Sequence, residues 1–424
     1  MDFELSPRTV ELRDRISAFL DEHVYPVELE AMRALDDEVA PGVPYPEILV
    51  DIRARARHEG LWNLFMPDER YGAGLTNVEY GVLCEEMGRS PAIAPMAFNC
   101  SAPDTGNMEI LAEHGSDEQR ERWLQPLLDG EIRSCFSMTE PEVAGSDPTT
   151  LRTRAELDGD DWVINGHKWF TSGAVGAAVA IAMVVTDPDA PQYARASMIL
   201  VPTDNPGFDL VRPVPVMGHS GGPGHCEIRY EDCRVPAVNL LGPRQAGFVI
   251  AQDRLGPGRI HHCMRAIGTA ERAIEMMCRR ASEREAFGSK LAEKQFVQDF
   301  IAKSRMEVDQ ARLLTLLAAW KMDTAGKRAA RQEISMIKVV AANMVMDVLD
   351  RAIQVHGSLG MSDDTPLAWM WRFSRMLKVA DGPDEVHKMV IARREVNRWA
   401  EGDEAGGDSA APMTSAASGA LAQS

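Results

Sequence analysis

Two short segments, residues 135–147 and 163–173, carry the residue types that could bind a flat ligand with polar edges. Each segment runs along a plausible β-strand and ends in hydroxyl-bearing residues and glycines. An aromatic side chain can cover the face of a planar ring, while hydroxyls and backbone N–H groups can hydrogen-bond its rim. The two segments together therefore predict a binding site for such a ligand.

Three later segments offer groups for phosphate binding and proton abstraction. They read Arg-Glu-Ala-Phe-Gly at 284–288, Gln-Val-His-Gly-Ser-Leu-Gly at 354–360 and Ala-Asp-Gly-Pro-Asp-Glu at 380–385. An arginine guanidinium is a fixed fork that suits a pyrophosphate, and glycine lets the backbone approach a ligand closely. A carboxylate can act as a general base when it is dry and within reach of its proton.

Metal-binding patterns are weak in this sequence. His261 and His262 are adjacent, so a helix would point their rings to different faces, and a packing role is favoured. Seven cysteines are present and none forms a Cys-x-x-Cys pair, which predicts buried free thiols rather than zinc ligands or disulfides. We therefore expect no metal.

Composition limits the function classes. A chain of 424 residues predicts two or three packed units, and 45% hydrophobic with 26% charged residues is typical of a soluble globular protein. A formal net charge of −19 disfavours nucleic acid, although a few local Arg and Lys residues could still bind an anionic substrate. We find no membrane-spanning run and no signal peptide, so we expect a cytoplasmic protein with no membrane partner.

The elements that must position these residues change type along the chain. Helical patterns fill residues 1–132, short strands fill 133–243, and long amphipathic helices return over 244–400. The predicted fold is α+β and multidomain: an N-terminal all-α domain, a middle antiparallel β-barrel or sandwich, and a C-terminal four-helix bundle. Residues 401–424 have no apolar period and are predicted to be disordered.

Local signals support these boundaries. Ser6 can cap a helix that has Pro7 at its first position, and Ser116 can cap another. Residues 153–157 and 162–164, joined through Asp158-Gly159, predict a hairpin. Further strand candidates are 179–185, 197–201 and 228–235. Two apolar stripes are expected to pack in the bundle: Leu313, Leu316, Leu317 and Trp320, and then Ile337, Ala341, Met344 and Val348.

Two runs connect the sequence to a known family. One is Thr-Glu-Pro-Glu-Val-Ala-Gly-Ser-Asp at 139–147, and the other is Arg-Leu-Gly-Pro-Gly-Arg-Ile-His-His-Cys-Met-Arg at 254–265. The chain resembles the acyl-CoA dehydrogenase family over nearly its whole length, and most closely the dehydrogenase domain of fused phosphotransferase–dehydrogenase proteins. The resemblance implies oxidation of an acyl-CoA thioester to the trans-2-enoyl-CoA: a carboxylate removes the α-proton and flavin takes a hydride from the β-carbon.

The resemblance also implies a set of FAD-binding residues. Phe136, Met138 and Thr139 match the first flavin strand; Gly145 and Ser146 follow it, with Ser146 also near the entrance of the CoA chain. Phe170 and Ser172 stand where relatives usually have Trp and Thr. Residues of two later segments would bind the adenine-dinucleotide half of FAD from a neighbouring subunit: Arg284, Phe287, Gln295, Gln354, Gly357 and Ser358. Pro383 and Glu385 are also expected to bind the cofactor.

The proposed base departs from the usual pattern of the family. Most relatives have Glu where this chain has Asp381, which is one methylene shorter; the closest branch also has Asp. Some relatives place the base at the position of Gly258, which cannot serve. Asp381 is therefore the expected catalytic base. Asp384 or Glu385 reaching in, or a different chemistry with no base, remain alternatives, and Arg259 is expected near the acyl-CoA together with Ser146 and Asp381.

Several points of function stay open on the sequence. The close branch suggests a 4-hydroxy- or 4-phospho-acyl-CoA, while a flavin acyl-CoA oxidase or an elimination enzyme of the same fold is the alternative. A DNA-binding member of the fold would need a basic surface, which a net charge of −19 does not favour. The resemblance further implies an electron-transfer flavoprotein as acceptor, a role in fatty-acid β-oxidation, and a homodimer or homotetramer.

Overall fold

The computed structural model describes residues 4–36, 45–218 and 224–400. The predicted tail at 401–424 lies outside the described residues. Contacts between residues divide the chain into two compact units. The first unit takes Met1–Ala34, Glu47–Cys100 and Gly256–Arg394, and the second takes Leu35–Pro46, Ser101–Leu255 and Glu395–Ser424. The domain boundaries expected from the sequence stay predictions.

The first unit begins with helices whose ends follow the sequence signals. Ser6 caps the first helix by accepting from the Thr9 N–H, and Pro7 is its first residue, as predicted. Thr76 caps a later helix in a capping box with Glu79. The helices are α1 (Pro7–Phe19), α2 (Glu28–Asp36), α3 (Glu47–His58), α4 (Asn77–Gly88) and α5 (Ala94–Ala97), with a π-turn at Leu20–Val24 and a 3₁₀ turn at Tyr25–Val27.

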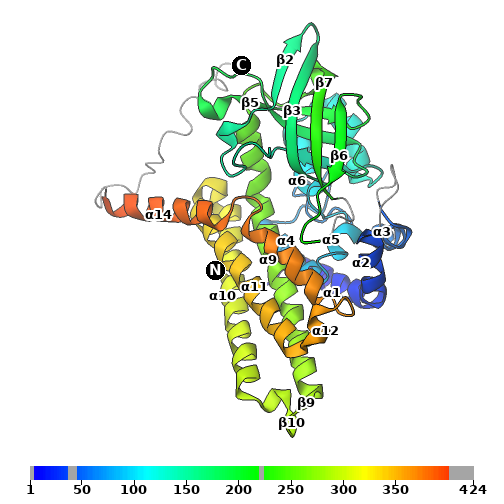
Figure 1. Cartoon of the computed structure of the whole chain (residues 1–424), viewed down its shortest axis with the longest axis vertical. Coiled ribbons are helices and arrows are strands. Elements are labelled where there is room, and N and C mark those ends of the chain that lie inside the picture. The colour runs from blue at the N-terminus through cyan, green and yellow to red at the C-terminus, as the bar shows by residue number, and fades with distance from the viewer. Residues whose placement is uncertain (1–3, 37–44, 219–223, 401–424) are drawn as a thin grey trace. The chain divides into compact units, whose positions relative to one another are not determined.

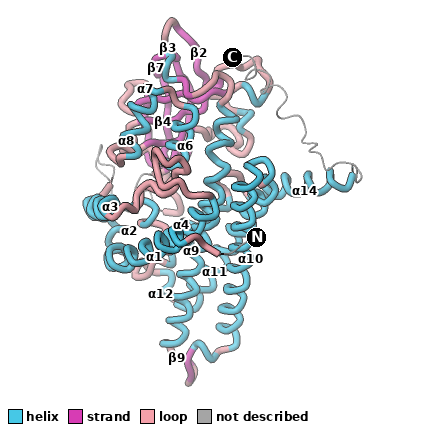
Figure 2. Tube along the Cα trace, turned by 180° about the vertical axis from the view of Figure 1, so that it is seen from behind, coloured by secondary structure: helices cyan, strands magenta, loops and turns pink. Residues whose placement is uncertain are grey.

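Long helices form the rest of the first unit. A small hairpin of two short strands sits at the tip where α9 passes to α10 (Figures 1 and 2). The first residues of α9 belong to the second unit. The elements are α9 (Gly247–Glu283), β9 (Glu285–Ala286), β10 (Ser289–Lys290), α10 (Gln295–Ala329), α11 (Arg331–His356), α12 (Ser358–Met361), α13 (Leu367–Arg375) and α14 (Asp384–Ala400).

One of the two predicted bundle stripes is wrong. On α10, Leu313 and Trp320 are exposed by 48% and 41%, so they do not face the bundle. The buried face of α10 instead carries mostly small residues, which let neighbouring helices approach closely: Ser304, Val308, Ala311, Thr315, Ala318, Ala319 and Met322. On α11 the prediction is confirmed, because Ile337, Ala341, Met344 and Val348 are all buried.

The second unit combines short helices with one sheet. Ser116 caps α7 in a capping box with Gln119, as its sequence predicts. The predicted hairpin is present, with Asp158 paired to Asp161 across the turn. The helices are α6 (Asp104–His114), α7 (Asp117–Gln119) and α8 (Gln125–Leu128), with a π-turn at Arg120–Leu124 between the last two.

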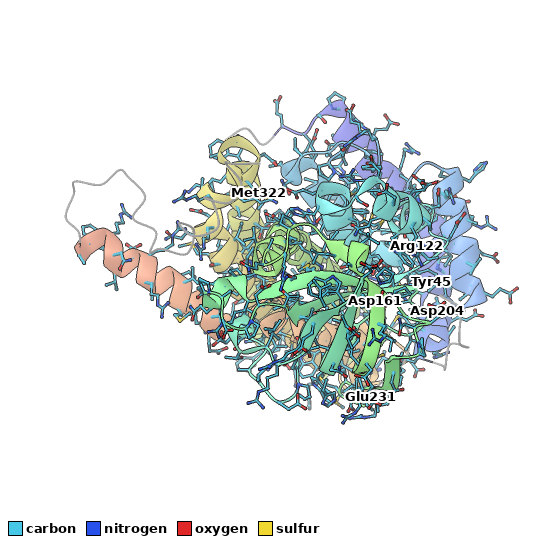
Figure 3. The ribbon with its side chains drawn as sticks, turned by 90° about the horizontal axis from the view of Figure 1, so that it is seen from above. Tyr45, Arg122, Asp161, Asp204, Glu231 and Met322 are labelled. Carbon is cyan, nitrogen blue, oxygen red and sulfur yellow. The ribbon has the colours of Figure 1, made fainter. Side chains whose placement is uncertain are left out.

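The sheet confirms a middle β domain but is not wholly antiparallel. The order is β6-β7-β3-β1-β4-β5-β8, with β2 beside β3 and β4, and β1 runs parallel to β4. Asp161 on β3 and Glu231 on β7 are labelled where the sheet is viewed from above (Figure 3). The strands are β1 (Ser134–Ser137), β2 (Arg154–Asp158), β3 (Asp161–Ser172), β4 (Val179–Val185), β5 (Ala196–Pro202), β6 (Phe208–Pro213), β7 (His225–Pro236) and β8 (Leu240–Leu241).

Candidate active site

The two segments predicted to bind a flat ligand lie side by side in the second unit. Phe136 of β1 is paired with Ser172 of β3. Just beyond β1, the Thr139 carbonyl accepts from the Trp169 N–H at 2.8 Å. The structure therefore brings Phe136, Met138 and Thr139 together with Phe170 and Ser172, although the segments are separated in sequence.

Phe170 is presented by an unusual backbone. Its φ is 52°, in the left-handed region that aromatic residues rarely adopt, and 39% of its surface is exposed. One side of the ring stacks on His225, with centroids 5.3 Å apart and planes at 22°. The Ser172 hydroxyl lies 2.8 Å from His225 Nδ1. His225, which the sequence did not single out, thus supports both residues, and burial lowers its pKa so that the neutral ring is favoured.

A buried ion pair fixes the segment that includes Met138. The Lys168 ammonium donates to the Met138 carbonyl at 2.8 Å, to Glu140 Oε1 at 2.9 Å and to the Met183 carbonyl at 2.7 Å. Both side chains of the pair are almost fully buried. Burial lowers the pKa of Lys168 to about 8, while Glu140 acts in the opposite direction. The pair was missed because twenty-seven residues separate it in sequence.

Two further features shape the surface beside these strands. A Cβ built on Gly145 would lie 3.0 Å from Thr139 Cγ2, so glycine allows the loop to approach the strand closely. Ser146 beside it is exposed. The Arg254 guanidinium lies 4.1 Å from the centre of the Phe136 ring and covers one face of it. A ligand can therefore meet only the remaining face or the edge of Phe136.

Asp381 lies in the first unit, in the loop before α14, with a φ of 55°. The backbone there is held from two helices: Arg259 Nε of α9 donates to the Asp381 carbonyl at 3.0 Å, and His387 Nε2 of α14 lies 3.2 Å from the same oxygen. His262 Nε2 lies 3.7 Å from Asp381 Oδ2. Arg259 was predicted near this residue, but His262 and His387 were not.

The preceding residues of the loop are held from α11. The buried Lys338 ammonium donates to the Leu377 carbonyl at 2.7 Å and to the Ala380 carbonyl at 2.8 Å. Burial lowers the pKa of Lys338, and burial likewise lowers the pKa of His387 to about 4, with Arg259 and Lys338 adding to that effect. Backbone and side-chain contacts from three helices thus define where Asp381 stands.

The alternative carboxylates differ from Asp381 in their surroundings. Asp384 is buried, and its Oδ2 accepts from Asn343 Nδ2 at 3.0 Å. Glu385 is exposed in the first turn of α14, just after Pro383. An acidic residue in the first turn of a helix stabilises the helix through its dipole, so Glu385 needs no catalytic role to explain its presence.

The remaining predicted FAD residues are exposed and lie elsewhere in the first unit. Phe287 is fully exposed at the tip of the β9–β10 hairpin, with a φ of 49°. Gly357 ends α11 with a φ of 66°. The exposed members of this set are Arg284, Phe287, Gln295, Gln354, Gly357 and Ser358.

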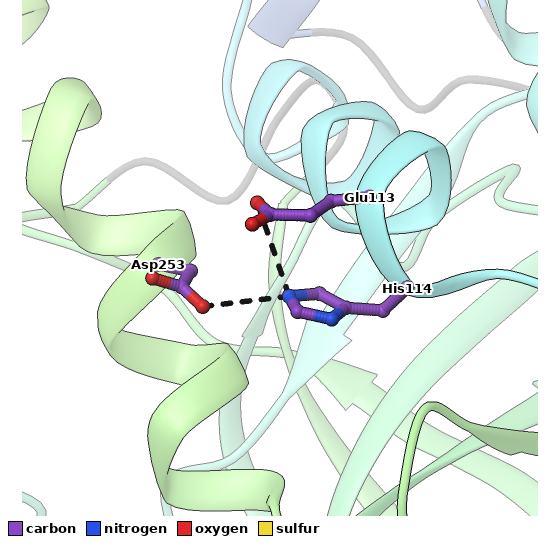
Figure 4. Close-up of side chains that lie close together, drawn as sticks. All are labelled: Glu113, His114 and Asp253. Carbon is purple, nitrogen blue, oxygen red and sulfur yellow. Dashed lines mark ion pairs between the residues drawn. The ribbon is translucent and has the colours of Figure 1, made fainter. Parts of the chain in front are cut away.

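One group of possible metal ligands occurs among the described residues: Glu113, His114 and Asp253, with ligand atoms within 4.8 Å of one another (Figure 4). His114 Nε2 lies 3.4 Å from Asp253 Oδ2 and 3.9 Å from Glu113 Oε2. Exposed acidic groups commonly lie together without a metal, and Glu113 is exposed. Six of the seven cysteines are buried, and Cys278 is half-buried.

Comparison with known proteins gives the family. Residues 6–131, 135–233 and 245–396 match the N-terminal, middle and C-terminal domains of acyl-CoA dehydrogenase. The chain belongs to the acyl-CoA dehydrogenase family. It is accordingly an FAD-dependent oxidoreductase that acts on acyl-CoA. Among the described residues, no helix is long and apolar enough to cross a membrane.

Individual relatives agree with this family. The chain is 52% identical to the Mycobacterium tuberculosis protein named probable acyl-CoA dehydrogenase FadE2, covering 94% of this chain and 98% of that one. It is 49% identical to mouse acyl-CoA dehydrogenase family member 10 over 92% of this chain, but it spans only 37% of that protein. The structure of butyryl-CoA dehydrogenase from Megasphaera elsdenii superposes with a TM-score of 0.79 at 25% identity, covering 93% of this chain and all of the other.

Proposed function

We propose that Asp381 is the base of this acyl-CoA dehydrogenase and that its carboxylate removes the α-proton of the bound thioester. The observation that carries the proposal is the support of the Asp381 loop by Arg259, His387 and Lys338. A base that is one methylene shorter than the usual Glu depends on a fixed backbone, because proton transfer requires positioning within about an ångström. Asp384 is buried and accepts a hydrogen bond from Asn343 of α11, so it is the weaker candidate.

The residues beside β1 and β3 suit the isoalloxazine of FAD. Phe170 offers an exposed aromatic face, Ser172 a hydroxyl, and the loop at Gly145 a close backbone approach. When bound, FAD supplies the redox chemistry and accepts two electrons with the β-hydrogen of the substrate. The chain's own contribution is to bind and orient the two ligands and to take the α-proton on an Asp381 carboxylate oxygen.

The experiment compares Asp381→Asn with Asp364→Asn, which makes the same change at an exposed loop position of the same unit. Each protein is loaded with FAD and mixed anaerobically with a panel of acyl-CoAs, including 4-hydroxy and 4-phospho forms, while flavin bleaching is followed. We expect Asp364→Asn to bleach like the unaltered enzyme and Asp381→Asn to lose at least about a hundredfold in rate. Bleaching of Asp381→Asn at the unaltered rate would rule Asp381 out.

We also propose that the active enzyme is at least a dimer, in which a neighbouring subunit binds the adenine-dinucleotide half of FAD. The loop of Asp381 meets α11 at Lys338, whereas Gln354 is sixteen residues further along the same helix, about 24 Å at 1.5 Å per residue. One set of FAD residues therefore lies far from the base within a single chain. The exposed Met306, Leu313 and Trp320 on α10 offer an apolar face for association. Sedimentation of the FAD-loaded protein as a monomer would contradict this proposal.

Substrate and acceptor are the finer parts of the proposal. Relatives named acyl-CoA dehydrogenases favour an acyl-CoA as substrate, and the resemblance favours an oxygen at C4 of the acyl chain. An electron-transfer flavoprotein is the proposed acceptor, and peroxide formation in air would favour an oxidase instead. A place in β-oxidation follows from the same resemblance and is proposed with it, while a cytoplasmic location is proposed only as the default expected from the sequence.

A further inference from the structure

His262 faces the reactive end of Asp381, whereas the other basic residues around the loop bind its backbone. Arg259, Lys338 and His387 contact carbonyl oxygens of the loop. His262 Nε2 lies 3.7 Å from Asp381 Oδ2, and each of the two side chains is 21% exposed. The two groups are thus close enough for an ion pair and open enough for a substrate or water to reach them.

The orientation of the His262 ring is set by a neighbour one helical turn away. Arg265 Nη2 lies 3.5 Å from His262 Nδ1, and the same guanidinium donates through Nη1 to the Cys100 carbonyl at 3.2 Å. A guanidinium can only donate, so Nδ1 accepts and the proton of the neutral ring is on Nε2. That nitrogen points toward Asp381. The donor side of the imidazole therefore faces the carboxylate whether or not the ring is charged.

We propose that His262 is a positioning residue for the carboxylate of Asp381. This inference rests on the proposed function, in which Asp381 is the base. A short side chain on a fixed backbone still rotates about its own bonds, and an N–H on one side restricts that rotation. In acid, the imidazolium also favours the ionised form of the carboxylate. His262 would thereby hold the Asp381 carboxylate in one orientation and in its ionised form.

Other charged or titratable groups face Asp381 and must be weighed in any pH profile. They come from α9, α11 and α14, and they are Arg259, Cys263, Lys338 and His387. Burial raises the pKa of Cys263 to about 12 and lowers the pKa of His387 to about 4. Between about pH 4 and pH 12, neither Cys263 nor His387 changes its charge. A change in the profile over pH 5 to 8 that appears in both His262 variants and not in the control is assigned to the His262–Asp381 pair taken together.

The kinetic test uses His262→Gln and His262→Leu, with His58→Gln on the exposed surface of α3 as the matched control. The substrate is the acyl-CoA that bleaches the unaltered enzyme fastest. We expect His262→Leu to lose about tenfold in kcat with little change in KM. Glutamine keeps a donor and should recover part of that loss. In both variants the acid limb of the kcat/KM profile should move up by about one pH unit.

A titration that needs no turnover tests the pair directly. The imidazole nitrogens of ¹⁵N-labelled protein are followed by NMR against pH, and the His262 signal is identified by its loss in His262→Gln. We expect His262 to take up its proton at a higher pH in the unaltered protein than in Asp381→Asn. Identical titration in both proteins would overturn the inference, even if acyl-CoA bleaches the flavin.

The outcomes separate the inference from the function on which it rests. If the unaltered enzyme is not bleached by any acyl-CoA, the proposed function fails while the titration still measures the pair. If the enzyme is bleached but both His262 variants keep the kcat and the acid limb of the control, only the positioning role fails. Equal losses in both variants with an unmoved acid limb would indicate a packing role and also overturn the inference. Should His262→Leu not fold, His262→Gln and the titration decide.

Discussion

His387 should make the free energy of unfolding fall as the pH falls, and His387→Gln should remove this part of the pH dependence. The ring is buried beside the Asp381 carbonyl, and burial, Arg259 and Lys338 together lower its pKa from 6.5 to about 4. An unfolded chain takes up this proton below pH 6.5, whereas the folded protein takes it up only near pH 4. The unfolded state therefore binds more protons in that window, and the free energy of unfolding falls as the pH falls.

The size of the effect follows from the two pKa values. Each pH unit in the window is equivalent to about 1.4 kcal/mol, so His387 should cost about 3 kcal/mol of the free energy of unfolding between pH 7 and pH 4. That loss corresponds to about 6–12 °C in the melting temperature of a unit of this size. His387→Gln cannot take up the proton, and its amide can still donate to the Asp381 carbonyl.

Thermal unfolding at fixed pH values from 7.5 to 4 measures the prediction, with excess FAD throughout. Other buried histidines contribute to the slope in both proteins, so the quantity of interest is the difference between them. We expect His387→Gln to be the less stable protein at pH 7 and to lose that disadvantage on acidification. His58→Gln should keep the full slope, because His58 is exposed. Parallel slopes for the unaltered protein and His387→Gln would refute the reasoning.

Three further substitutions test how the units are built. In Gly268→Ala the new Cβ would lie 1.8 Å from the Glu85 carbonyl oxygen, so we expect the free energy of unfolding, measured with a chemical denaturant, to fall by about 3 kcal/mol. In Gly258→Ala the new Cβ has no atom within 4 Å, so the free energy of unfolding should rise by up to about 1 kcal/mol. Equal changes in the free energy of unfolding for the two alanine variants would contradict the close contact between Gly268 and Glu85. Lys168→Met should cost about 3–5 kcal/mol by leaving the Glu140 charge buried without its partner, and should weaken FAD binding measured by fluorescence; unchanged stability would contradict that role.

Local sequence signals predicted the elements well because they act over a few residues. Ser6 and Ser116 cap helices as their hydroxyls and following residues predict, and the Asp158-Gly159 hairpin is present. The alternation of helical and strand patterns was enough to separate helical parts from a middle β domain. The family motifs likewise located Phe136, Ser172 and their neighbours, which the sheet then pairs.

Pairings between distant residues could not be predicted from those signals. The apolar stripe through Leu313 and Trp320 has a helical period, but packing buried the small-residue face of α10 instead. The charge of Lys168 gave no hint that its ammonium is buried against Glu140. Helical periodicity says which residues share a face, and it does not say which face meets a neighbour.

The sequence by itself determined the family and the cofactor and predicted one carboxylate, Asp381, as the base, because motifs of a few residues carry that information. Only the tertiary structure decided what surrounds that carboxylate. Arg259 and His262 lie more than a hundred residues before Asp381, and Lys338 lies on another helix. Their contacts exist because three helices pack around one loop, and that packing depends on the shape and burial of many side chains at once.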